Sequence, residues 1–240
     1  MSTVKLSRTV RVLWLSATVI LSFVAVTGCH RSVDSETMLN YIFSEYPGCE
    51  LPCWKGIIPG ETEEEELFSI VAGQLNQELT VDESYPLPAG GSEYLWIDKT
   101  SDVPTKVRFE ESANNPVEFI SFSVGGHVHL GAIIDALGAP EFYTSDAGLA
   151  EESFFSLNLF YTDMGVVVGV YQTPYSIPNS ARSPECTIEI DSDTPVRQMW
   201  LTRPGSFESL LEQLANNIPA QGQPLRWPGT GEIYLTDCDE

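Results

Sequence analysis

Apolar residues recur at helical spacing in four stretches of the chain, and each stretch is bounded by residues that start or stop a helix. Thr62 and Glu65 have the spacing of a capping box before one of them, whereas Pro47 ends the first and Gly138 the third. The four stripes are Met38, Ile42 and Phe43; Leu67, Ile70, Val71 and Leu75; Leu130, Ile133, Ile134 and Leu137; and Phe207, Leu210, Leu211 and Leu214. We therefore expect four amphipathic helices.

Between these stripes, shorter segments alternate apolar and polar residues as half-buried antiparallel strands do. Turn residues rich in proline, asparagine and glycine separate them. The predicted strands cover residues 93–98, 105–110, 117–124, 157–161, 166–171, 187–190 and 196–202. Helices followed by antiparallel strands indicate the α+β class.

The closing strands of the two strand groups match each other. Pro116, Val117, Ile120, Phe122 and Gly126 are each followed 79 residues later by Pro195, Val196, Met199, Leu201 and Gly205. The stripe that begins at Leu130 returns 77 residues later, and the two-residue difference falls at His127 and His129. We predict two tandem helix-plus-antiparallel-sheet units, residues 57–126 and 127–205, then a C-terminal helix and tail, residues 206–240.

The N-terminus has the layout of an export signal. Lys5, Arg8 and Arg11 precede an apolar run over residues 12–26, and the first 29 residues contain no acid. The run is shorter than the roughly 20 residues that a membrane-spanning helix needs. We therefore expect residues 1–28 to be a cleaved signal peptide, with an uncleaved anchor helix as the alternative.

This run ends in Val26-Thr27-Gly28-Cys29, which resembles the lipobox of bacterial lipoproteins. The resemblance implies that Cys29 is the acylated new N-terminus and that the protein is anchored to the cell membrane on its extracytoplasmic face. Several acyl chains would hold it more firmly than one. Residues 29–56 would then form a lipid-anchored tether, a short helix and the Cys49/Cys53 loop.

The chain is strongly acidic, with 12 basic and 34 acidic residues and a formal charge of −22. Loss of the leader, which holds three of the basic residues and no acid, makes this −25. Nucleic acid is therefore not an expected partner, because it recruits positive surfaces.

Four cysteines follow Cys29, and an even number in an exported chain indicates two disulfides with three alternative connectivities. We favour Cys49 with Cys53 in a tight proline- and glycine-rich loop, and Cys186 with Cys238 closing a long loop. The Cys49-x-x-x-Cys53 spacing also resembles the CxxxC of copper-chaperone lipoproteins, in which proline rather than Trp54 follows. That resemblance implies a copper or thiol-redox protein as the alternative.

Other chemistry is sparse in the sequence. His127 and His129 would share one face of a strand and could hold a metal with a carboxylate, but loop or cap roles are commoner beside Gly125-Gly126 and a helix start. We find no motif of a known hydrolase, nucleotide-binding loop, zinc protease or calcium loop. We therefore expect no metal, no cofactor and no enzymatic activity.

The segments GIIPGET and HLGAIIDALGAP, set in this helix-and-strand order, resemble the SmpA-type outer-membrane assembly lipoproteins and the secreted beta-lactamase inhibitory proteins. The likeness spans about residues 57–216. Because neither family is enzymatic, it implies a module that binds a protein or another envelope ligand. A solute- or glycan-binding lipoprotein remains a further alternative.

Overall fold

The computed structural model of the chain describes residues 34–43, 46–74, 85–86, 92–97, 104–109, 116–148, 154–172, 187–214 and 224–234. All of them belong to one compact unit, Val33–Glu240. The leader with Cys29, and both Cys186 and Cys238, lie outside the described residues.

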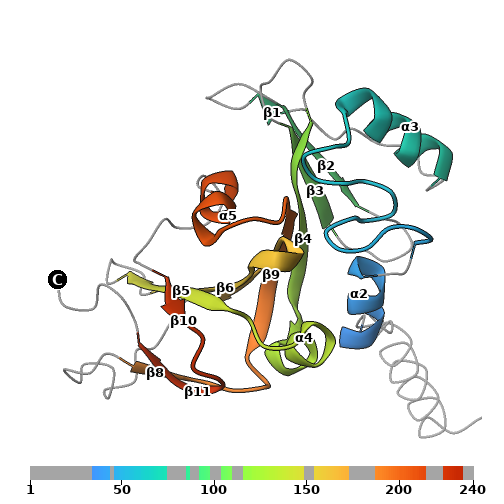
Figure 1. Ribbon diagram of the computed structural model, residues 1–240. Helices are drawn as coiled ribbons and strands as arrows, with labels where there is room; N and C mark the ends of the chain where they lie inside the picture. Colours follow the sequence, from blue (N-terminus) through green and yellow to red (C-terminus); the bar gives the residue numbers. More distant parts are fainter. Residues whose placement is uncertain are drawn as a thin grey trace, which may run out of the picture. The chain divides into compact units, whose positions relative to one another are not determined.

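The four predicted helices are confirmed (Figure 1). They are α2 (Ser35–Ile42), α3 (Glu64–Gln74), α4 (Leu130–Leu137) and α5 (Phe207–Leu214). At the start of α2 the Asp34 carboxylate accepts a hydrogen bond from the Thr37 backbone amide at 2.8 Å, so this helix has a polar N-cap. One short 3-10 turn, η1 (Thr162–Met164), connects two strands.

The predicted strands are also present, and the antiparallel α+β class is confirmed. The strands are β1 (Tyr85–Pro86), β2 (Ser92–Ile97), β3 (Pro104–Phe109), β4 (Val117–His129), β5 (Phe142–Gly148), β6 (Phe154–Tyr161), β7 (Val166–Gln172), β8 (Thr187–Ile190), β9 (Pro195–Thr202), β10 (Leu225–Arg226) and β11 (Gly231–Tyr234). Nine of them form one sheet in the order β1-β2-β3-β4-β9-β7-β6-β5-β10, and β8 pairs with β11.

The centre of the large sheet is the antiparallel pair β4 and β9. Its register sets Ile120 against Leu201 and Phe122 against Met199. Strands from both halves of the sequence thus share one continuous sheet, and the boundary that we predicted between residues 126 and 127 falls inside β4.

Each face of this sheet carries its own hydrophobic cluster. Along β4, Ile120 and Phe122 contribute to the larger cluster, which also takes in α2 and α4, whereas Phe119 points the other way. There it joins Trp200 of β9 and the buried side of α5 in the smaller cluster. Figure 1 shows α2 and α5 on opposite sides of β4. The sheet is therefore buried on both faces where these helices cover it.

Several local features differ from the sequence-based expectations. The capping box at Thr62 is wrong: α3 begins at Glu64, and the buried Thr62 hydroxyl instead accepts a hydrogen bond from the Ile58 amide at 2.8 Å. Strand β5 was not predicted, because Thr144 and Ser145 interrupt its apolar pattern although both are buried. The tail contributes β10 and β11 as edge pairings.

No helix among the described residues is long and apolar enough to cross a membrane.

Candidate functional site

The Cys49–Cys53 disulfide lies in the segment that follows α2. The two Cα atoms are 5.2 Å apart, as the tight-loop interpretation requires. The Cys49 amide donates to the Tyr46 carbonyl and the Cys53 amide to the Glu50 carbonyl, so two consecutive turns form this short loop. Both cysteines are half-buried, which leaves part of the disulfide open to solvent.

Trp54 anchors this loop in the core. Its side chain is 1% exposed, and its indole nitrogen donates to the Tyr41 carbonyl of α2 at 3.2 Å. The Trp54 ring meets the ring of Tyr41 edge-on at 5.6 Å between centroids and that of Phe122 at 5.3 Å. The disulfide loop is thus tied both to α2 and to the central strand β4, and the interpretation of Trp54 as a packing residue is confirmed.

The turn after Trp54 brings a backbone donor to the disulfide. Lys55 has a φ of +50° and Gly56 a φ of +90°, and backbone hydrogen bonds in both directions between Trp54 and Ile57 close the turn. The Gly56 amide donates to Cys49 Sγ at 3.3 Å. The Lys55 ammonium lies 4.1 Å from the centroid of the Tyr41 ring, a cation–π contact that favours this uncommon backbone conformation.

The two histidines lie at the end of β4, where the strand bulges. The register with β9 shifts between Ser123 and Val128, so residues 124–127 together lie opposite Arg197, whose guanidinium donates to the Gly125 carbonyl at 3.1 Å. His127 and His129 are exposed, and His129 occupies the N-cap position of α4 without a side-chain cap hydrogen bond. Within the described ranges, no group of three or more His, Cys, Asp or Glu residues could hold a metal ion.

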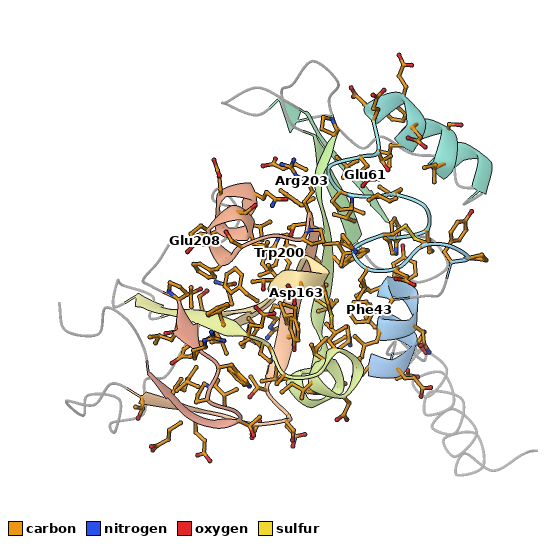
Figure 2. All side chains as sticks on the ribbon, viewed as in Figure 1. Phe43, Glu61, Asp163, Trp200, Arg203 and Glu208 are labelled. Atoms are coloured by element: carbon orange, nitrogen blue, oxygen red, sulfur yellow. A yellow bond between two sulfur atoms is a disulfide. The ribbon has the colours of Figure 1, made fainter. Side chains whose placement is uncertain are left out.

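Trp200 is a site residue that the sequence interpretation did not single out. Figure 2 shows it beneath α5, the helix that carries Glu208, and its side chain is 3% exposed. Its indole nitrogen is buried without a hydrogen-bond partner, and the ring lies against Gly169 of β7. The signal was present, because Met199-Trp200-Leu201 is an apolar run in an otherwise alternating strand, which indicates burial on both faces.

On the opposite face of the sheet, Tyr161 is also buried and its hydroxyl has no hydrogen-bond partner. Burial raises the pKa of Tyr161 far above the usual value, because the interior disfavours the phenolate. This tyrosine therefore remains protonated at any physiological pH.

Comparison with known proteins gives no relative. No family model matches the chain, no curated protein is similar to it, and no solved structure matches its fold. The resemblances to lipoproteins, assembly lipoproteins and inhibitory proteins thus rest on the quoted sequence segments alone.

Proposed function

We propose that the protein is a lipoprotein of the cell envelope, held to the membrane by acyl chains on Cys29 and facing away from the cytoplasm. The observation that carries this proposal is the Cys49–Cys53 disulfide in a chain that begins with an export-like leader. Disulfides persist in oxidising compartments and are rare in the cytosol. Only five residues separate Cys29 from Asp34, so the α2 end of the body would stay within about 18 Å of the acylated residue.

We further propose that the body is a non-enzymatic module that binds another envelope protein, built from two tandem units. The resemblance to assembly lipoproteins and inhibitory proteins supports this function, since those families bind proteins. The register of the central strands supports the tandem origin, because residues that match 79 apart in the sequence face one another across β4 and β9.

A thiol-redox function of Cys49 and Cys53 is the second candidate. The hydrogen bond from the Gly56 amide to Cys49 Sγ favours it, because donors of this kind stabilise a thiolate. A copper site would need the same two sulfur atoms in reduced form.

Metabolic labelling with a fatty acid in a bacterial host tests the anchor. The wild-type chain should incorporate label and partition with membranes, whereas Cys29→Ser should do neither. Cys49→Ser is the matched control, since it removes a cysteine outside the lipobox and should label like the wild type. Label retained by Cys29→Ser would exclude acylation at that residue.

Site-specific photo-crosslinking in the envelope tests the binding function. Photoreactive residues would replace exposed side chains on separate elements, namely Tyr46, Asp163, Glu189 and Glu208. A binding module should give one reproducible protein adduct from some of these positions and none from the others. Adducts with lipid or glycan alone, or no adduct from any position, would contradict protein binding.

A further inference from the structure

The two sulfur atoms of the Cys49–Cys53 disulfide have different surroundings. Cys49 Sγ accepts a hydrogen bond from the Gly56 amide at 3.3 Å. Among the residues that the structure describes, no donor lies at hydrogen-bonding distance from Cys53 Sγ. Because a hydrogen bond to an anionic acceptor is stronger than one to a neutral acceptor, the Gly56 amide stabilises negative charge on Cys49 more than it stabilises the disulfide.

The fold holds this donor in place. Trp54 and Ile57, which exchange backbone hydrogen bonds on either side of Gly56, are both buried. The intervening Lys55 packs its ammonium over the ring of Tyr41 in α2. The turn therefore stays attached to the core whether or not the disulfide is closed, and the amide is already positioned when charge develops on Cys49.

We infer that this disulfide is a site of thiol–disulfide exchange with a fixed direction, in which an external dithiol attacks Cys53 and Cys49 is the leaving group. Both cysteines are half-buried, so part of the bond is open to an attacking thiolate. The rate of exchange depends on how well the departing thiolate is stabilised, and here only Cys49 has a donor for that charge.

The exchange balances as follows. The first thiolate of the dithiol forms a bond to Cys53 Sγ, the bond between Cys53 and Cys49 breaks, and its electron pair leaves on Cys49. The second thiolate of the reductant then attacks the sulfur of its own mixed disulfide and displaces Cys53, which takes a proton from water. Cys49 is protonated according to the pH. The protein disulfide gains two electrons, and the dithiol is oxidised to a disulfide.

Charged neighbours in the loop are few. Glu50 is exposed and lies between the two cysteines in the sequence, so its charge opposes thiolate formation at both. The Lys55 ammonium lies over Tyr41 and 5.1 Å from the centroid of the Trp54 ring. The asymmetry thus rests on the Gly56 amide.

Trapping the mixed disulfide tests the direction in the wild-type protein. The oxidised soluble form, beginning after Cys29, is exposed to excess glutathione as a monothiol probe, quenched in acid and mapped by mass spectrometry. Glutathione should be found on Cys53 in about tenfold excess over Cys49, given the usual strength of a hydrogen bond to a charged group. Equal adducts, a majority on Cys49, or no adduct at all would overturn the inference.

Two single-cysteine variants provide the matched comparison. Cys53→Ser leaves Cys49 beside the Gly56 amide, and Cys49→Ser leaves Cys53 without a donor. The pH dependence of alkylation by iodoacetamide should have its midpoint at lower pH for Cys49 than for Cys53. Equal midpoints, or a lower midpoint for Cys53, would contradict the assignment. Trp54 fluorescence at native wavelength would verify that both variants keep the loop anchored.

Discussion

Ser121 of β4 lies directly opposite Trp200 of β9, and the two residues are 79 positions apart in the sequence. This separation is the one at which the closing strands of the two predicted units match. At this pair the cross-strand partner and the sequence match coincide, so a two-fold relation through it would exchange β4 with β9. Two copies of one unit joined edge to edge would give this register, which supports the tandem proposal.

The neighbourhood of Trp200 gives the first prediction. A Cβ atom on Gly169 would lie 2.8 Å from Cζ3 and 2.9 Å from Cη2 of the Trp200 ring, which is fixed between the sheet and α5. Gly169→Ala should therefore lower the free energy of unfolding by about 1–3 kcal/mol, as overpacking does. Urea denaturation of the soluble form measures this change.

Gly205→Ala is the control for that variant. The added methyl group would meet the Ser209 hydroxyl at 3.1 Å, and a flexible side chain can move away. Its effect should stay below about 0.5 kcal/mol. Equal losses in the two alanine variants would mean that contact with Trp200 is not what excludes a side chain at residue 169.

The N-cap of α2 gives a pH-dependent prediction. The hydrogen bond from the Thr37 backbone amide lowers the pKa of Asp34, so this carboxylate stabilises the folded state. That contribution is complete above the ordinary aspartate pKa of the unfolded chain and is lost as the pH falls through the lowered pKa of the folded state. Asp34→Ala should destabilise the protein at neutral pH and have a much smaller effect in strong acid.

Asp34→Asn separates the cap from the charge, because asparagine also caps helices but does not titrate. Thermal unfolding curves should give this variant a stability close to that of the wild type at neutral pH. A stability difference between Asp34→Ala and the wild type that does not change with pH would contradict a role for the ionised carboxylate.

Removing the anchor of the disulfide loop should be costly. Trp54 is buried among Tyr41, Phe122 and the larger cluster, so Trp54→Ala should lower the unfolding free energy by about 3–5 kcal/mol. Trp54→Phe keeps an aromatic ring but loses the hydrogen bond to the Tyr41 carbonyl, and should lose clearly less. Chemical denaturation that ranks the two variants equally would show that the ring does not stabilise this loop through packing.

The sequence predicted the elements with strong local signals and missed those that depend on distant contacts. The stripe from Leu130 to Leu137 gives α4 to the residue, because Gly138 takes a positive φ and ends the helix. The disulfide loop followed from two cysteines among prolines and glycine. The donor to Cys49 could not be predicted, because it requires a positive φ at Lys55, a residue that rarely adopts one, and this depends on the packing of Tyr41.

The pairing of β8 with β11 bears on the second predicted disulfide. Thr187 pairs with Tyr234, and these residues lie one and four positions from Cys186 and Cys238. Four residues reach about 14 Å, enough to bring the two cysteines within bonding range. Non-reducing peptide mapping should find the Cys186–Cys238 link, and replacing both with serine should cost at most about 4 kcal/mol. A free thiol at either position, or a link to another cysteine, would contradict this pairing.

Cutting the sheet at its centre tests whether the two halves depend on each other. A fragment that ends after Gly126 keeps β4 but loses β9, so Ile120 and Phe122 lose their cross-strand partners Leu201 and Met199. The fragment also loses α4 and α5, which cover the two faces of the sheet. We expect it to show no cooperative thermal transition by circular dichroism, and we expect addition of the complementary fragment from His127 onward to restore one. A cooperative transition in the first fragment alone would mean that each unit folds independently and that the β4–β9 pairing joins two finished domains.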